Sequence, residues 1–115
     1  MSANLLVHIC QKSEWKVAQA VGSYRASGMA VDGFIHCSRP EQVLTVANRY
    51  YAGVAGLVLL WIDQQDLASE VRWEGADGEI FPHIYGPVNL SAVISVVDFQ
   101  PDTDGVFRKL PRPEL

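Results

Sequence analysis

Residues 57–62 of the chain read Leu-Val-Leu-Leu-Trp-Ile, an apolar run with no polar interruption. A run of this kind is typical of a central β-strand that is covered on both faces, because a half-exposed strand alternates apolar and polar side chains. Asp63 follows directly and marks the point where the strand leaves the core. We therefore expect other elements to pack against both faces of this strand.

Further strands are predicted on both sides of this run. Three segments are mostly apolar and rich in residues that favour strands, namely residues 4–10, 34–37 and 92–99. A fourth segment, residues 70–74, alternates instead. Val71 and Trp73 are expected to face one way, and Arg72 and Glu74 the other. This last strand is therefore predicted to be half-exposed.

Two helices are predicted from their start and stop signals. Ser13 suits the N-cap of the first helix, which Gly22 ends, and the apolar residues between them recur at helical spacing. Ser38 to Glu41 has the form of a capping box, in which the Ser38 side chain accepts a hydrogen bond from the Glu41 backbone. A second amphipathic helix follows this box and is expected to end at Gly53.

The remaining segments are predicted to be turns and loops. Tyr24–Asp32 contains small, flexible residues, residues 63–68 suit a turn or one helical turn, and Phe81–Pro87 is a rigid segment bounded by prolines. The tail after Gln100 shows no helix or strand pattern and is expected to be loose. The predicted fold class is α+β, with a mostly antiparallel β core and two main helices, in a single domain of residues 1–115.

Composition narrows the classes of function. Nine basic against thirteen acidic residues leave a net charge of −4, which opposes a phosphate backbone, so nucleic acid is not expected as a partner. There is no stretch of about twenty apolar residues and no signal-peptide pattern at the start, so we expect no membrane association and a cytoplasmic location. Cys10 and Cys37 are too few for a disulfide framework and are expected to be buried thiols.

Strand periodicity sorts the polar side chains. His8 and Cys10 share one face of their predicted strand, whereas His36 and Ser38 share a face from which Cys37 points away. The spacing of these residues matches no zinc signature, so no metal is expected. No glycine-rich phosphate loop follows the first strand, which excludes a Rossmann-type nucleotide site. The three histidines of the chain are instead expected to gather around one polar cleft.

Two stretches carry a resemblance to a known family. They are Gly-Phe-Ile-His-Cys-Ser at residues 33–38, and Glu74 followed by Phe-Pro-His-Ile-Tyr-Gly-Pro at residues 81–87. Together with the pair Tyr50-Tyr51 and the Trp-Ile-Asp end of the central strand, they resemble the bacterial family called domain of unknown function 952, over nearly the whole chain. This resemblance implies a fold like the NAD-binding core of ADP-ribosyltransferases.

The resemblance also implies which residues would form a site. Leu-Val-His-Ile near the start and Phe-Ile-His-Cys-Ser are similar to segments of RNA 2′-phosphotransferases, which carries over His8, His36 and Ser38. When a nicotinamide–ribose bond breaks, positive charge builds on the sugar, and a carboxylate stabilises it. Glu74 and His36 are the implied catalytic residues. The residues implied to bind the nucleotide are His8, Ser38, Tyr51, His83 and Tyr85.

Two functions from different classes follow. The first is binding of NAD or an ADP-ribose-like nucleotide as substrate, with transfer of ADP-ribose as the associated activity. The second is a non-catalytic module in which the same residues hold a small ligand or a protein segment. A cleft shared by His8, His36 and Glu74 would favour the first, whereas a Glu74 that points to bulk solvent would remove its only catalytic carboxylate.

Overall fold

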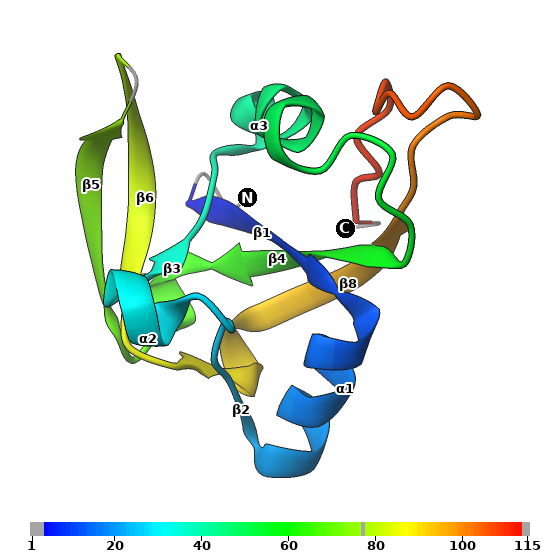
Figure 1. Ribbon diagram of the computed structural model, residues 1–115. Helices are drawn as coiled ribbons and strands as arrows, with labels where there is room; N and C mark the ends of the chain where they lie inside the picture. The colour runs from blue at the N-terminus through cyan, green and yellow to red at the C-terminus, as the bar shows by residue number, and fades with distance from the viewer. Residues whose placement is uncertain (1–3, 77, 114–115) are drawn as a thin grey trace.

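The structure, a computed structural model, describes residues 4–76 and 78–113 (Figure 1). Its elements in chain order are β1 (Leu5–Gln11), α1 (Lys12–Val21), β2 (Ser23–Tyr24), α2 (Met29–Asp32), β3 (Ile35–His36), α3 (Val43–Tyr50), β4 (Leu57–Asp63), β5 (Glu70–Ala76), β6 (Glu79–Tyr85), β7 (Val88–Asn89) and β8 (Val93–Phe99). The strand pairings are antiparallel, so the predicted α+β class with an antiparallel β core and two main helices is confirmed. Among the described helices, none has the length and apolar character needed to cross a membrane.

The predicted central strand is β4, the middle strand of a sheet with the order β1-β4-β8. Its residues 57–62 are at most 2% exposed. Val58, Leu60 and Ile62 belong to one core cluster, and Leu57, Leu59 and Trp61 to another. Because successive side chains of a strand point to opposite faces, the unbroken apolar run supplies a core on each face of the sheet.

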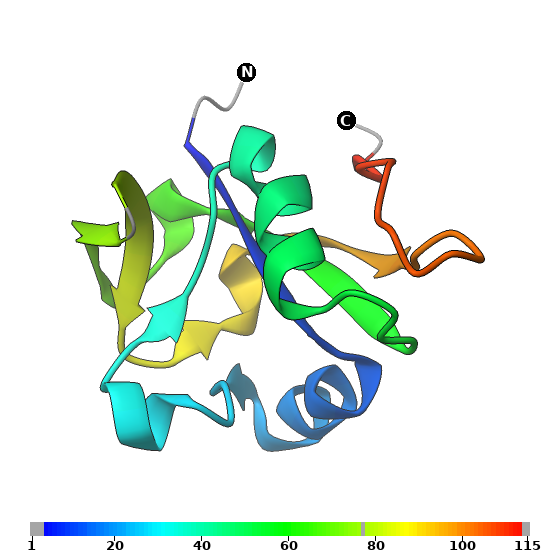
Figure 2. The ribbon, with the colours of Figure 1, turned by 45° about the horizontal axis from the view of Figure 1, so that its top comes forward.

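Different elements cover these two faces. α3 lies across one face, where Val43 and Ala47 pack into the cluster around Trp61 (Figure 2). On the opposite face, Ala18 of α1 packs into the other cluster, and Ile84 reaches the same cluster from the sheet β3-β6-β5. β1 is an edge strand of the central sheet.

A single bridge joins β1 to the segment that follows β3. The Val7 N–H donates to the Ser38 carbonyl and the Ser38 N–H donates to the Val7 carbonyl, both at 2.8 Å. The predicted capping of the second helix by Ser38 is therefore wrong, because Ser38 is part of a strand pairing. The chain first forms a 3-10 turn, Pro40–Gln42, in which the Gln42 side chain accepts from the Arg39 N–H at 2.9 Å. α3 starts only after this turn.

The first helix also starts earlier than predicted. α1 begins at Lys12 with Gln11 as its N-cap, not Ser13, and the Gln11 N–H donates to the Glu14 side chain at 3.1 Å. The carboxylate of Glu14 thereby accepts from the backbone of the N-cap residue, as the N3 acid of a capping box does. The end of the helix is as predicted, because Gly22 adopts a left-handed conformation with φ 102°.

Residues 81–87, predicted as a rigid segment, contain most of β6, the middle strand of its sheet. Proline is rare in a middle strand because it donates no hydrogen bond. The Pro82 carbonyl accepts from the Cys37 N–H at 3.1 Å, so the missing N–H of Pro82 lies on the same side, where β3 has already ended at His36. The pairing with β5 on the other side is unaffected.

The segment after Gln100 is packed rather than loose. Phe107 is 2% exposed and stacks on Phe99, with ring centroids 4.5 Å apart. The Asn48 side chain donates to the Phe107 carbonyl at 2.9 Å and accepts from the Phe107 N–H at 2.7 Å. One aromatic ring and one amide anchor this segment, and neither leaves a periodic pattern in the sequence. That is why the sequence predicts a loose tail.

The predicted loop Tyr24–Asp32 contains short elements. β2 pairs with β7, and the single turn of α2 follows, ended by Gly33 with a left-handed φ of 83°. The turn directs Asp32 back toward the start of β3, where it meets His36. The loop therefore contributes a charged side chain to the neighbourhood of the histidines.

Candidate functional site

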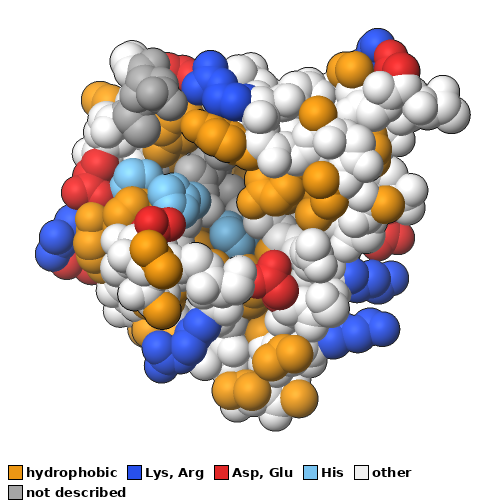
Figure 3. Space-filling model, in the orientation of Figure 1, with side chains coloured by type: hydrophobic (Ala, Val, Ile, Leu, Met, Phe, Trp, Pro, Cys, Tyr) orange, Lys and Arg blue, Asp and Glu red, His pale blue; other side chains and the backbone are white. Residues whose placement is uncertain are grey.

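A cavity of about 820 Å³ opens beside β1, with α3 on one side and α2, β3 and β6 on the other. All three histidines of the chain line it. Figure 3 shows histidine side chains along the wall of a hollow on this face of the molecule. The three come from β1, β3 and β6, so the cavity forms only when these separate strands fold together.

His8 is buried and both of its ring nitrogens have protein partners. Nδ1 lies 2.6 Å from the His36 carbonyl, and Nε2 lies 2.7 Å from the Tyr24 hydroxyl. Because a carbonyl oxygen only accepts, Nδ1–H is the donor and Nε2 accepts from Tyr24. Burial lowers the pKa of His8, which favours the neutral ring that these two bonds require. His8 therefore holds β3 and β2 against β1.

His36 is paired with Asp32 at the rim of the cavity. The His36 Nε2–H donates to the Asp32 carboxylate at 2.9 Å, and the His36 side chain is 62% exposed. The Asp32 carboxylate lies four residues earlier in the chain, at the end of α2. The pair leaves Nδ1 of His36 as the ring atom through which it can contact a ligand.

His83 is held by Glu74 of the neighbouring strand. The His83 Nδ1–H donates to Glu74 Oε1 at 2.8 Å, and the Tyr85 hydroxyl donates to the same oxygen at 2.6 Å. The hydrogen bond from Tyr85, and after it the one from His83, hold the pKa of the Glu74 carboxyl below its usual value, so Glu74 is an anion. The Arg72 guanidinium lies 4.3 Å from the centre of the Tyr85 ring and adds positive charge beside this group.

Phe34 joins the His36–Asp32 pair and the His83–Glu74 pair into one wall. Its ring stacks on His83 with centroids 4.0 Å apart and lies 4.7 Å from the His36 ring. The His36 and His83 rings meet edge to face at 5.3 Å. His36, His83 and Phe34 therefore present an aromatic surface that carries two imidazoles, each oriented by its own carboxylate.

The opposite wall and the mouth of the cavity are more polar. α3 and the residue after it contribute Thr45, Arg49, Tyr50 and Tyr51 to the lining. Glu14 of α1 also lines the cavity, and its carboxylate accepts from the Ser27 N–H at 3.3 Å. Glu14 thereby ties α1 to the loop in front of α2.

The residues implied by the resemblance fall into two groups. Those that line the cavity are His8, His36, Ser38, Tyr51 and His83. Glu74 and Tyr85 are not among the lining residues, although both belong to the cluster around His83. The Glu74 side chain is 40% exposed and turned toward His83. The structure therefore places Glu74 behind a histidine rather than in the cavity.

Sequence reasoning missed Asp32 and Tyr24. The spacing of four residues between Asp32 and His36 was a usable signal, since short turns often bring such residues together. Nothing in the sequence pairs Tyr24 with His8, because the two side chains lie 16 residues apart in the chain and meet only in the folded protein.

The cysteines are free, as predicted, and buried. Burial raises the pKa of Cys10 to about 12 and also raises the pKa of Cys37, which keeps both as thiols rather than reactive thiolates. Within the described residues, no three His, Cys, Asp or Glu side chains gather as ligands for a metal ion.

A family model described as "Protein of unknown function (DUF952)" matches residues 9–96 of the chain. The chain belongs to this family. The family resemblance drawn from the two sequence motifs is thereby confirmed. A search of curated proteins finds no match to this DUF952 protein.

Solved structures of a similar protein, CC0527 from Caulobacter crescentus, match most of the chain. The X-ray structure of CC0527 is 36% identical, with a TM-score of 0.83, and the match covers 90% of this chain and 93% of CC0527. The solution NMR structure of the same protein is 36% identical over 91% of this chain and 92% of that one, with a TM-score of 0.79. This DUF952 protein therefore shares the fold of CC0527.

Proposed function

We propose that this protein binds a nucleotide-like small molecule, NAD or an ADP-ribose-like compound, in the cavity beside β1. The observation that carries the proposal is the convergence of all three histidines on one cavity of about 820 Å³. Pockets for small molecules typically measure roughly 300–1,000 Å³, with mostly apolar walls and a few placed polar groups. A nucleotide is proposed as the ligand because the sequence motifs imply a likeness to the NAD-binding core of ADP-ribosyltransferases.

The two walls suit different parts of such a ligand. The aromatic wall of Phe34, His36 and His83 offers a flat surface on which a nicotinamide or adenine ring can stack. Polar groups that can bind ribose hydroxyls or phosphate are the Ser38 hydroxyl and the Arg49 guanidinium, both in the lining. The ligand therefore has stacking and hydrogen-bonding partners in the same cavity.

The geometry supports binding more directly than transfer of ADP-ribose. A transferase needs a carboxylate that faces the ribose as positive charge develops on it. Glu74 accepts from His83 and Tyr85 and does not line the cavity. This observation favours the second candidate, a non-catalytic binding module. In it, the same cavity holds the ligand and Glu74 only orients His83.

Isothermal titration calorimetry with NAD and with ADP-ribose tests the proposal. The wild type should bind, and His36→Ala should bind at least about ten-fold more weakly, a loss of about 1.4 kcal/mol. Ile94→Ala removes a partly exposed side chain on β8, outside the cavity lining, and should bind like the wild type. Circular dichroism checks that both variants fold. Absence of binding by folded wild type at millimolar nucleotide would refute the proposal.

A further inference from the structure

We propose that His83 is a catalytic base, positioned by Glu74 and Tyr85, which activates water for hydrolysis of a ligand bound in the cavity. The inference rests on the proposed function in one respect only: a ligand occupies the same cavity. It reverses the roles that the family resemblance implies, because His83 acts on the ligand and Glu74 acts through His83.

The hydrogen bonds determine which nitrogen of His83 can take a proton. Glu74 Oε1 accepts from Nδ1–H at 2.8 Å, so in the neutral ring Nε2 carries the lone pair. The ring edge with Nδ1 is turned toward Glu74, which does not line the cavity, whereas His83 itself does. Nε2 is therefore the nitrogen left available for a ligand in the cavity that His83 lines.

The ring is also held in a fixed orientation. Phe34 stacks on its face at 4.0 Å, with 22° between the ring planes, and the His83 side chain is only 8% exposed. Tyr85 donates to the same Glu74 oxygen at 2.6 Å, which fixes the carboxylate in turn. Tyr85 thus orients Glu74, and Glu74 orients His83. A general base held in place in this way is suited to catalysis.

The groups packed around His83 include one anion in direct contact with its ring. Three groups face it: Glu74 from β5, Tyr85 from β6 and His36 from β3. Two more charged groups lie behind these, since Arg72 is over the Tyr85 ring and Asp32 of α2 pairs with His36. Glu74 is the anion in direct contact, so it stabilises the imidazolium that forms when His83 takes a proton.

The reaction step needs only water and the ligand. His83 Nε2 takes a proton from water as the water oxygen bonds to the electrophilic atom of the ligand. The bond to the leaving group then breaks, its electron pair stays with the leaving group, and His83 returns the proton to the leaving group or to solvent. No oxidant, reductant or metal enters this balance.

Hydrolysis of p-nitrophenyl acetate, a small aromatic ester that suits the aromatic wall, is the test. The wild type should hydrolyse it above the buffer rate, more slowly in heavy water, with a rate that rises with pH and then levels off. His83→Gln should lose about 100-fold of the enzymatic rate, the low end of general-base effects. Glu74→Gln should lower kcat by at least about ten-fold and leave KM unchanged, because Glu74 orients the base and does not line the cavity.

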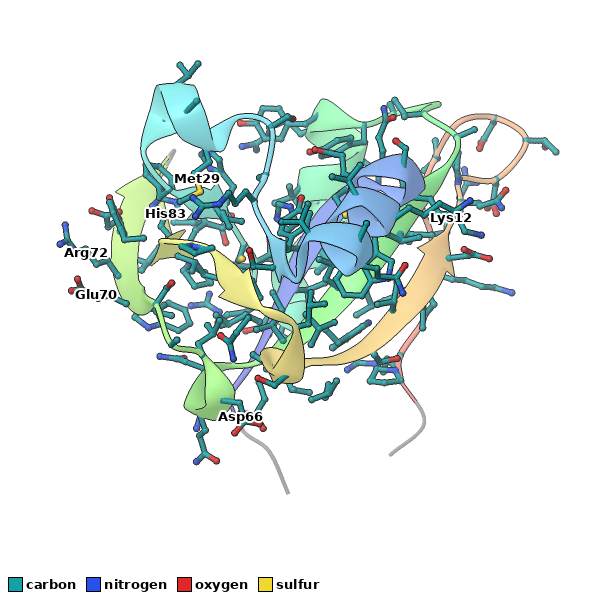
Figure 4. The ribbon with its side chains drawn as sticks, turned by 90° about the horizontal axis from the view of Figure 1, so that it is seen from below. Lys12, Met29, Asp66, Glu70, Arg72 and His83 are labelled. Atoms are coloured by element: carbon teal, nitrogen blue, oxygen red, sulfur yellow. The ribbon has the colours of Figure 1, made fainter. Side chains whose placement is uncertain are left out.

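The matched control is Glu70→Gln, the same change on the same strand. Figure 4 shows Glu70 and Arg72 pointing outward from β5, while His83 lies farther inward. Glu70 pairs with Arg72 at 3.2 Å, and its variant should keep the wild-type rate. Circular dichroism checks folding, and Glu74→Gln keeps the test decisive if His83→Gln does not fold.

The outcomes separate this inference from the proposed function. Hydrolysis at the buffer rate by the wild type, or an unchanged rate in folded His83→Gln, would overturn the catalytic role. If hydrolysis depends on His83 but calorimetry finds no nucleotide binding, the base stands and the nucleotide proposal fails. If the nucleotide binds and no His83-dependent hydrolysis occurs, the protein is a binding module.

Discussion

Acidification should destabilise this protein through His8. The ring is buried, donates to the His36 carbonyl and accepts from the Tyr24 hydroxyl, so the fold requires its neutral form. Burial lowers its pKa from the ordinary value of 6.5, with the result that the unfolded chain binds this proton at a higher pH than the folded protein. The free energy of unfolding is therefore highest above pH 6.5 and falls as the pH drops from 6.5 toward the folded-state pKa.

The size of the effect follows from proton linkage. When a proton is bound by the unfolded chain but not by the folded protein, the free energy of unfolding changes by about 1.4 kcal/mol per pH unit. Above the pKa of 6.5 the term is small, and one unit below it the loss is about 1.4 kcal/mol, provided the folded-state pKa lies lower still. Between about pH 7.5 and about pH 5.5, His8 alone should therefore remove up to about 1.4 kcal/mol.

Urea unfolding followed by tryptophan fluorescence at several pH values measures this loss. His8→Gln is the reference, because its amide can donate to the His36 carbonyl and accept from the Tyr24 hydroxyl without titrating. Subtracting the two curves removes the contributions of the other titratable groups. A difference between wild type and His8→Gln that stays constant from pH 7.5 to pH 5.5 would show that the reasoning is wrong.

Four further predictions concern packing and reactivity. Phe107→Ala should lower the free energy of unfolding by about 3–5 kcal/mol, and Asn48→Ala by about 1–3 kcal/mol, in urea titrations, because the last segment loses its buried ring or its two hydrogen bonds. Gly86→Ala should lower the melting temperature, since its φ is +150° and a Cβ there would lie 2.4 Å from a serine hydroxyl oxygen. Cys10 and Cys37 should react with a thiol reagent such as Ellman's reagent only in urea, and fast reaction of the folded protein would contradict their burial.

The sequence by itself determined the layers of the fold. The apolar run at 57–62 has no polar side chain for a solvent-facing surface, so its strand had to be central, and the structure covers it on both faces. Gly22 ends the first helix because it can adopt a left-handed φ. The two motifs at 33–38 and 81–87 were enough to identify the family. Each of these features depends only on residues that are close together in the chain, so it can be predicted from the sequence.

Helix starts and the last segment were predicted less well. Ser38 has the side chain of a cap, but its backbone pairs with Val7, a residue far away in the chain. Phe107 is held by Asn48, again over a long separation. A polar side chain or a lone aromatic residue carries no information about a distant partner, so neither contact could be derived from spacing.

Only the tertiary structure decided the roles of the site residues. The pairing of β5 with β6 places Glu74 opposite Phe81, on the face that also carries His83 and Tyr85, and this register turns the carboxylate to His83. A shift of the register by one residue would send Glu74 to the opposite face of the sheet. Sequence motifs identified a carboxylate and a histidine worth attention. Which of the two borders the cavity depends on a pairing between strands, and no local pattern encodes that register.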